Sequence, residues 1–451
     1  MDYVLIEQIR SDAESIFKGS LEAVDPYKAV KRFVRVEDNT LLVGSEKDEK
    51  IELDLTKYGR ILVVGGGKAT ASMAKAIEEI LGQRISKGII NVKYGFMEHL
   101  VFTEIVEAGH PVPDESGVKG TKGILELLSG AGERDLVISL ISGGGSALLV
   151  HPAETITLQE KQALTQMLLG CGASIDEINA IRKHISSSKG GQMARAAYPA
   201  TVVNLMLSDV VGDRIDVIAS GPFTPDSSTF SHAWAVIKKY DLARDIPISI
   251  RGYLKAGLEG RVPDTPKEGD RIFHEVFNFI VGSNILALEE AEKRAREIGY
   301  KTLIFSSQVE GETRDVARVH SAIAKEIVTT GHPIPPPACI ISGGETTVTI
   351  RGNGLGGRNQ EFGLAAALDL DNFPGNVVIL SGGSDGNDGP TDAAGAIVDP
   401  LTVRRGKTFG IEAEDYLKNN DSYHYLEKTN DLFVTGPTNT NVMDIRLILV
   451  K

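Results

Sequence analysis

The sequence predicts an α/β protein of two domains, in which parallel strands are joined by crossover helices. Short β-branched apolar runs alternate with longer segments of helical periodicity along most of the 451 residues. Four of the apolar runs pass directly into glycine clusters, two in each half of the chain. Between the halves, residues 259–270 read EGRVPDTPKEGD, and this richness in Pro, Gly and charge is typical of a linker. We therefore expect one domain at 1–262 and a second at 263–451.

The first half follows a helical N-terminal region and contains the clearest strands. Helical periodicity runs through KATASMAKAIEEIL from Lys68 and TLQEKQALTQMLL from Thr157. The predicted strands are Arg60 to Val64, Glu104 to Ala108, Asp135 to Ile141 and Thr201 to Leu207. The second half repeats the alternation, with apolar runs at 277–284, 302–308, 338–344 and 376–383 and helix-period segments at 285–299, 312–331 and 357–368. Both halves therefore have the pattern of an α/β fold.

Composition excludes several classes of protein. With 48 Lys and Arg against 61 Asp and Glu, the net charge of −13 argues against a nucleic-acid or anionic-membrane partner. Cys171 and Cys339 are too few for a disulfide framework, which fits a reducing compartment. The N-terminus does not have the form of a signal peptide, and no apolar run reaches about 18 residues. We expect a cytoplasmic protein that binds small molecules, and a homo-oligomer remains open.

The glycine clusters predict a phosphate site. The 48 glycines exceed the usual share of about 7%. Ligands of open parallel sheets bind outside the carboxyl ends of the strands, where backbone N–H groups of a glycine-rich turn can reach phosphate. A single cluster is explained equally well by a tight turn, but four such clusters favour a ligand. The predicted nucleotide or phosphate contacts are Gly66, Gly67, Gly143, Gly144, Gly145, Ser146, Gly343, Gly344 and Glu345.

Two cations are the strongest candidates for catalysis. Lys68 follows three glycines at a helix start, where a positive charge is disfavoured unless an anion compensates it, although a solvated lysine is the simpler alternative. The segment fits neither a P-loop, because Ala69 replaces its Ser or Thr, nor a dinucleotide fingerprint, because Thr70 replaces its third small residue. Arg358 stands between a glycine-rich loop and a helix, where its planar fork could grip carboxylate or phosphate or pair with a nearby acid.

Acidic loops and one basic stretch add further candidates. Asp385, Asp388 and Asp392 share a glycine-rich loop, and Asp209 follows an apolar strand. Such carboxylates suit Mg²⁺ bound together with substrate phosphates, although each could instead cap a turn. Lys189 lies in AIRKHISSSKGGQMA, whose local positive charge suits an anionic ligand, and a solvated helix face explains it almost as well.

Several of these motifs together resemble the class II glycerate kinases, the glycerate 2-kinases whose C-terminal part is the MOFRL domain. They are VVGGGKA, GHPVPDESG, ISGGGSALL, RKHISSSKGGQMA, LMLSDVVGDRIDVIASGPF, ISGGETTVTIRGNGLGGRNQEF and SGGSDGNDGPTDAAGAIVD, in the expected order from about Ile61 onward. The resemblance implies a Rossmann-like three-layer N-terminal domain, a smaller α/β C-terminal domain of MOFRL type and an active site in the cleft between them. It also implies ATP-dependent phosphorylation of D-glycerate, generally to 2-phosphoglycerate, with active-site residues that match Lys68 and Arg358.

The resulting hypothesis assigns a role to each candidate. Lys68, Arg358 and Asp209 are the predicted catalytic residues. Lys68 and Arg358, with Ser142 and Lys189, are predicted to bind glycerate or the transferring phosphoryl group. Asp385 and Asp392 are predicted to hold Mg²⁺ or another divalent cation.

Three alternatives stay open at the level of sequence. An NAD(P)H-dependent hydroxypyruvate reductase would act on a closely related substrate, although the dinucleotide fingerprint is incomplete. A kinase could act on the 3-hydroxyl instead, and a binding module without catalysis would need no cation from each domain. Product analysis and an assay of NADH consumption distinguish these alternatives.

Overall fold

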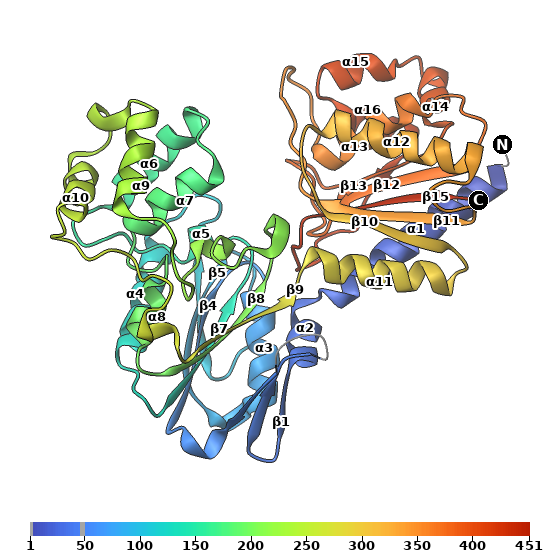
Figure 1. Ribbon diagram of the computed structural model, residues 1–451. Helices are drawn as coiled ribbons and strands as arrows, with labels where there is room; N and C mark the ends of the chain where they lie inside the picture. The colour runs from blue at the N-terminus through green and yellow to red at the C-terminus, as the bar shows by residue number, and fades with distance from the viewer. Residues whose placement is uncertain (1–2, 46–49) are drawn as a thin grey trace. The chain divides into compact units, whose positions relative to one another are not determined.

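The computed structural model describes residues 3–45 and 50–451, which form two compact units (Figure 1). The N-terminal unit contains Pro26–Ser208 and Asp213–Val281. The C-terminal unit contains Gly282–Lys451, the short stretch Asp209–Gly212 and the residues up to Asp25. In the described part of the chain, no helix is both long enough and apolar enough to cross a membrane.

The N-terminal unit is built on a six-stranded sheet in the order β6-β5-β4-β7-β8-β9. The pairs along β6-β5-β4-β7-β8 are parallel, and every residue of β7 and β8 is buried, as expected for strands covered on both faces. The strands are β4 (Arg60–Gly66), β5 (Ile85–Lys93), β6 (Thr103–Ala108), β7 (Asp135–Ile141), β8 (Thr201–Leu207) and β9 (Val276–Gly282). This order confirms the predicted Rossmann-like fold.

The position of the crevice in this sheet follows from the strand order. From β4 the chain moves to β5 through α3 (Thr70–Leu81), and from β6 it returns past β4 to β7 through α4 (Glu115–Ser129). Since such crossovers are right-handed, α3 and α4 cover opposite faces of the sheet, as Figure 1 shows. The strand order therefore reverses between β4 and β7, and ligands of doubly wound sheets bind at that point, outside the carboxyl ends of the strands.

Smaller elements complete the N-terminal unit. An antiparallel sheet contains β1 (Val34–Glu37), β2 (Thr40–Val43) and β3 (Ile51–Asp54). Four helices share a separate apolar core to which Leu164, Ile181 and Phe230 contribute. They are α6 (Leu158–Gly170), α7 (Ile175–His184), α9 (Phe230–Lys239) and α10 (Ile248–Leu258), and the remaining helices of the unit include α2 (Pro26–Phe33), α5 (Gly145–Leu148) and α8 (Gln192–Ala197).

The C-terminal unit has a mixed sheet in the order β10-β11-β15-β12-β13-β14. The strand nearest the C-terminus, β15, is fully buried in the middle of the sheet and antiparallel to both β11 and β12. The first residue of β15 therefore lies beside the carboxyl ends of its two neighbours. The strands are β10 (Lys301–Val309), β11 (Ala338–Gly344), β12 (Val377–Gly383), β13 (Gly395–Val398), β14 (Leu432–Phe433) and β15 (Asp444–Val450).

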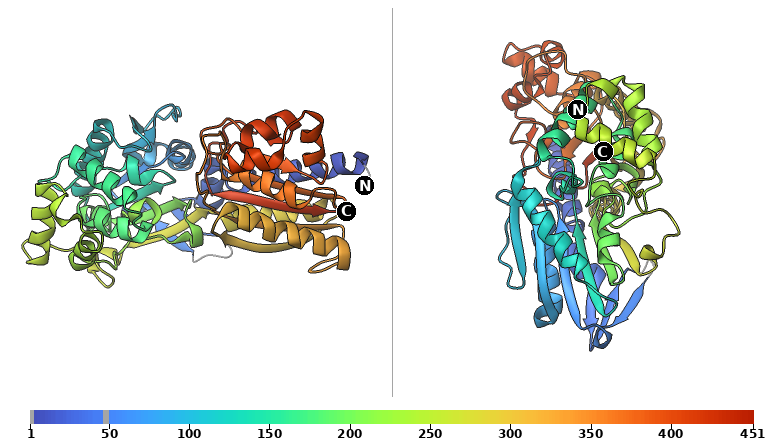
Figure 2. Two further views of the ribbon diagram at one scale, coloured as in Figure 1. Left: turned by 90° about the horizontal axis from the view of Figure 1, so that it is seen from above. Right: turned by 90° about the vertical axis from the view of Figure 1, so that its left-hand side faces the viewer.

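Helices cover both faces of this mixed sheet (Figures 1 and 2). On one face lie α12 (Thr313–Thr330) and α13 (Arg358–Asp369), with α14 (Thr402–Thr408), α15 (Ala413–Lys418) and α16 (Ser422–Thr429). On the other face lie α11 (Asn284–Glu297) and α1 (Tyr3–Ala23). The α/β C-terminal domain is thus present as predicted, in three layers.

The compact units differ from a single division of the chain after residue 262. The sheet of the N-terminal unit extends to β9, because Pro- and Gly-rich residues 259–270 connect elements of one unit. Helix α1 packs in the C-terminal unit, where the rings of Phe17 and Phe433 meet edge to face at 4.9 Å. Burial of its apolar side chains against α11 and β12 outweighs its closeness in sequence to β1.

Candidate active site

The glycine loops after β4 and β7 are bound to each other at the point where the strand order reverses. The N–H of Lys68 donates to the Gly143 carbonyl oxygen at 2.9 Å, and the N–H of Ala69 donates to Ser142 Oγ at 3.0 Å. Gly67 has φ +153°, and a Cβ there would collide with Ser142 Oγ. These contacts fix the backbone of Lys68, directly after the end of β4.

Ser142 is buried, with 1% of its surface exposed, and its hydroxyl lies 3.2 Å from Thr70 Oγ1. The structure therefore places this predicted substrate-binding residue inside the loop junction, where its visible contacts hold the start of α3.

The loop after β7 continues into a tightly packed turn. Gly144 has φ +84°, and a Cβ on it would lie 2.9 Å from His110 Cδ2 and 3.4 Å from Lys68 Cγ. Burial, followed by the charges of Lys68 and Lys93, lowers the pKa of His110 to about 4. His110 is thus a neutral side chain beside a cation at neutral pH. Ser146 Oγ lies 3.0 Å from Ser220 Oγ, which ties this loop to a second backbone turn.

That second turn is formed by Ala219 and Ser220, which have φ +51° and +62°. Non-glycine residues rarely adopt this conformation, which concentrates at functional sites. Lys189 contacts this turn from the protein interior. Its side chain is 0% exposed, and its Nζ donates a hydrogen bond to the Ala219 carbonyl oxygen at 3.4 Å. Burial, followed by the charges of Lys161 and Arg182, lowers the pKa of Lys189 well below its usual value. Lys189, predicted to bind substrate, is therefore buried and bonded to the backbone of the Ala219–Ser220 turn.

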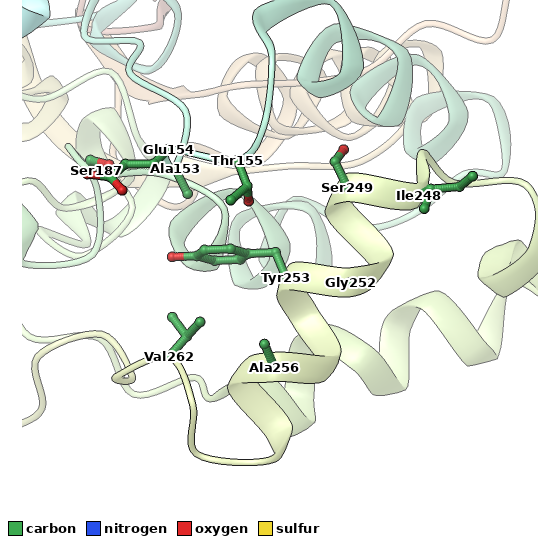
Figure 3. Close-up of a pocket in the computed structure, with 10 residues that line it drawn as sticks. All are labelled: Ala153, Glu154, Thr155, Ser187, Ile248, Ser249, Gly252, Tyr253, Ala256 and Val262. Atoms are coloured by element: carbon green, nitrogen blue, oxygen red, sulfur yellow. The ribbon is translucent and has the colours of Figure 1, made fainter.

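A cavity of about 350 Å³ opens beside the Gly144 turn. Gly144, Ser146 and Ala147 form one wall of it, and Lys161 and Arg182 contribute positive charge. A second cavity in this unit, of about 560 Å³, lies where Tyr253 projects from α10 toward Glu154 (Figure 3). Among the described residues that line the second cavity there is no Lys or Arg, so they provide no positive charge for a phosphate group.

In the C-terminal unit, Arg358 is the first residue of α13, and its guanidinium forms ion pairs with Asp444 and Glu345. Its Nε and Nη2 donate to the two carboxylate oxygens of Asp444 at 2.7 and 2.9 Å, and its Nη1 lies 2.8 Å from Glu345 Oε1. Burial lowers the pKa of Arg358, but Asp444 and Glu345 more than reverse this effect and keep it charged. The guanidinium is thus held in one orientation.

Asp444 is completely buried and connects the parts of this site. It pairs in register with Gly344 of β11 and Gly383 of β12, and it also accepts hydrogen bonds from Asn359 Nδ2 at 2.8 Å and Arg446 Nη2 at 2.9 Å. Its central position follows from the antiparallel insertion of β15. Sequence reasoning missed Asp444, because an acid before an apolar strand carries no sign of which strands will flank it.

The glycines of this unit have packing roles. A Cβ on Gly343 would collide with Asn284 Oδ1, and a Cβ on Gly344, which has φ +128°, would collide with the backbone of Val309. Glu345, predicted to contact phosphate, instead pairs with Arg358.

Several acids act on Glu345. Burial raises its pKa, Arg358 lowers it, and Asp444, Asp209 and Asp385 raise it further. Asp209 and Asp385 therefore lie within electrostatic range of one acidic cluster.

Asp388 and Asp392, in the loop after β12, make different contacts. Asp388 caps α13 by accepting hydrogen bonds from the N–H groups of Asn359 and Gln360 at 3.1 and 2.8 Å, and burial raises the pKa of Asp388 to about 7. Asp392 accepts a hydrogen bond from the Tyr423 hydroxyl at 2.8 Å. In residues 3–45 and 50–451, no group of three or more His, Cys, Asp or Glu side chains is placed to hold a metal ion.

Parts of both units match models of known protein families. A family model described as Domain of unknown function (DUF4147) matches residues 12–255, and a model of the MOFRL family matches residues 338–444. D-glycerate 2-kinase of Thermotoga maritima is 44% identical over 98% of this chain and 99% of its own length. A protein of Agrobacterium vitis, named provisionally as a hydroxypyruvate reductase, is 44% identical over 87% of each chain. The crystal structure of a glycerate kinase from Thermotoga maritima superposes with a TM-score of 0.87 at 43% identity, covering 99% of this chain and 100% of that one.

Proposed function

Because the chain belongs to the glycerate kinase family with a MOFRL domain, we propose that it transfers the γ-phosphoryl group of ATP to the 2-hydroxyl of D-glycerate. The products are 2-phosphoglycerate and ADP. The observation that carries this proposal is the 44% identity to D-glycerate 2-kinase of Thermotoga maritima over nearly the whole of both chains. D-glycerate and ATP are its small-molecule substrates, and we propose that it acts in the cytosol.

The N-terminal unit supports phosphate binding in this proposal. Phosphoryl transfer needs little covalent chemistry from the protein, which must align the reactants and stabilise the charge of the transferring group. The backbone of the Gly143–Ser146 loop and the ammonium of Lys68 supply donors for this purpose. Ser142 acts as a positioning residue, because its hydroxyl accepts the hydrogen bond from Ala69 and so fixes the Lys68 backbone.

Arg358 supplies the second cation. A guanidinium has five N–H donors, and three of them point to Asp444 and Glu345. The other two remain for the glycerate carboxylate or the transferring phosphoryl group. Because Asp444 fixes the plane of the guanidinium, little reorganisation is needed when the substrate binds, and such preorganised charge is the main source of electrostatic catalysis.

Asp209 and Asp385 are the acids that we propose for the hydroxyl and the metal. Both act electrostatically on Glu345, and the mutual repulsion of these carboxylates with Asp444 favours a cation among them. Mg²⁺ would neutralise phosphate charge there, and oxygen ligands of this kind suit it. Asp209 would accept a hydrogen bond from the 2-hydroxyl of glycerate and orient it. Asp392, predicted as a second metal ligand, is bonded to Tyr423 and is a weaker candidate.

The name of the Agrobacterium vitis relative raises hydroxypyruvate reductase as a second candidate. Dinucleotide sites on Rossmann-like sheets place an acid near the end of the second strand to bind the ribose hydroxyl. Here that strand, β5, ends at Lys93, and Tyr94 follows it. A kinase is therefore favoured over a reductase.

One assay separates these functions. The purified chain is incubated with ATP, Mg²⁺ and D-glycerate, ADP is measured, and the phosphoglycerate is identified by coupling to enolase with and without phosphoglycerate mutase. Formation of 2-phosphoglycerate is the expected result. Formation of 3-phosphoglycerate would move the reaction to the other hydroxyl, and oxidation of NADH with hydroxypyruvate in place of ADP formation would refute the kinase.

A further inference from the structure

Two buried lysines and one partly exposed arginine lie together in the N-terminal unit, and no ion pair with an acid is seen for them among the described residues. Lys161 on α6 is 4% exposed, and within residues 3–45 and 50–451 its Nζ has no hydrogen-bond partner. Lys189 is 0% exposed, and its Nζ donates to a backbone carbonyl oxygen, that of Ala219. Arg182 on α7 is partly exposed, and neither an ion pair nor a side-chain hydrogen bond of Arg182 is found in the described ranges. The three act on one another, since Lys161 and Arg182 both lower the pKa of Lys189.

A neighbouring lysine shows how this fold treats a buried charge that is structural. Lys183 is also 4% exposed, but its Nζ lies 3.3 Å from Asp226 Oδ1 and 3.4 Å from Asp216 Oδ2. An unpaired buried charge costs several kcal/mol, so it persists only where another gain offsets it. Lys161, Arg182 and Lys189 therefore need a different explanation from that of Lys183, because no acid pairs with them among the described residues, and an anionic ligand provides one.

The cavity beside the Gly144 turn is where such an anion would bind. Lys161 and Arg182 line it together with Gly144 and Ser146, whose loop is already proposed to hold phosphate. Arg182, the more exposed cation, would meet the anion first, and Lys161 behind it would add charge. The rest of the wall is uncharged at neutral pH. It combines apolar side chains such as Val112 and Leu169 with the amides of Gln162 and Gln166, the Thr165 hydroxyl and the neutral His110 ring.

The size and lining of the cavity distinguish between the two substrates. At about 350 Å³ it falls within the range of about 300–1,000 Å³ for pockets that enclose drug-sized ligands, and it is larger than a three-carbon acid requires. A single carboxylate would leave most of the positive charge unpaired, whereas a polyphosphate matches several cations. Apolar and amide-bearing walls suit a nucleobase, and the lining residues that the structure describes include no Asp or Glu to repel phosphate.

We propose that this cavity binds the nucleoside di- or triphosphate, with its phosphates at Arg182, Lys161 and the Gly144–Ser146 turn and its base against the apolar wall. The assignment rests on the kinase function proposed above and adds to it the location of the nucleotide. Lys161 and Arg182 are binding residues in this scheme, and Lys189 supports them from behind the turn.

The test uses ADP as the probe and titration calorimetry of the full chain near pH 7. Lys161→Met and Arg182→Met each remove one charge and keep an apolar stem. Each should weaken ADP binding at least ten-fold while leaving the KM for D-glycerate within about two-fold. Lys122→Met is the matched control, because Lys122 is 67% exposed on α4 and its nearest acid is 3.9 Å away. Its ADP affinity should equal that of the unmodified chain.

Thermal unfolding of each variant reports whether it is folded, so that a loss of affinity is assigned to the site. Unchanged ADP affinity in both folded variants would overturn the proposal. A ten-fold rise in the KM for D-glycerate with ADP affinity retained would also overturn it, and would place the acid substrate in the cavity while leaving the kinase function intact. If the unmodified chain turns over no D-glycerate but its ADP affinity depends on Lys161 and Arg182, the nucleotide site stands and the proposed function fails.

Discussion

Replacing Lys161 by methionine should stabilise the ligand-free protein. Burial, followed by the charge of Arg182, lowers the pKa of Lys161 from 10.5 to about 7. A pKa difference of one corresponds to about 1.4 kcal/mol. Lowering the pKa from 10.5 to about 7 therefore means that keeping the charged form of Lys161 in the folded chain costs about 5 kcal/mol. Relaxation of the protein reduces this figure, and we expect about 2–4 kcal/mol to be recovered in Lys161→Met. For domains of this size, such a gain raises Tm by roughly 5–10 °C.

The pH dependence gives this prediction its sign. Between about pH 7 and 10.5 the unfolded chain binds a proton at Lys161 that the folded chain has lost, so stability rises with pH in that window. Below about pH 7 both states are protonated and the full cost remains. The stabilising effect of Lys161→Met should therefore be largest at or below pH 7 and shrink toward pH 10. Within the described part of the chain, the groups that interact electrostatically with Lys161 include Arg182, Lys189 and His151.

Lys183→Met is the matched comparison, because it removes an equally buried ammonium that is paired. Burial raises the pKa of Asp226, but Lys183 and the hydrogen bonds from Ser228 bring it below its usual value. Removing Lys183 leaves the Asp226 carboxylate buried and less compensated, and breaking such a pair costs about 3–5 kcal/mol. Differential scanning calorimetry across pH 6–10 measures both variants. If Lys161→Met lowers Tm at pH 7 as Lys183→Met does, Lys161 is a structural residue and our reasoning about the unpaired charge is wrong.

Three further predictions concern the reaction itself. Lys68→Ala and Arg358→Ala should each lower kcat/KM for D-glycerate at least about 10²-fold in a folded chain, because one preorganised charge contact contributes about 3 kcal/mol; near-normal rates in both would remove them from the mechanism. Asp444→Asn should keep the volume of the side chain but release the Arg358 fork, so that kcat falls at least ten-fold and Tm falls as well; an unchanged kcat would show that Arg358 needs no such support. Chelation of divalent ions with EDTA should abolish turnover and added Mg²⁺ should restore it, whereas full activity after chelation would remove the acids from any role with a metal.

Local sequence was sufficient to predict where the candidate residues that follow a strand or begin a helix lie in the fold. Lys68 could be placed because its glycines come at the end of an apolar run, and in a parallel sheet that position is the ligand edge. Arg358 could be placed because a glycine-rich loop precedes the helix that it begins. Both predictions needed only the order of elements along the chain.

The rest depended on which elements become neighbours in space. Asp444 acquires its role only when β15 inserts antiparallel between β11 and β12. Lys161 lies on the buried face of α6, and the charge of Arg182 acts on it only once the chain has folded. The predicted boundary after residue 262 followed the Pro- and Gly-rich composition there. Composition does not register that α1 finds its apolar partners in the C-terminal unit. Long-range packing is not encoded in the local pattern that a single sequence displays.

The division of the C-terminal unit along the chain has a consequence for how the protein folds. Helix α1 is synthesised long before the strands that it packs on, since Phe17 packs on Phe433 and Val24 accepts a hydrogen bond from Thr440 at 2.7 Å. These contacts join residues from opposite ends of the polypeptide, so their contact order is very high, and such contacts form late in folding. The N-terminal unit can form its own core while the apolar face of α1 is still exposed to solvent. A fragment that begins at residue 263 would lack this helix, and we expect it to aggregate on expression unless α1 is supplied in trans.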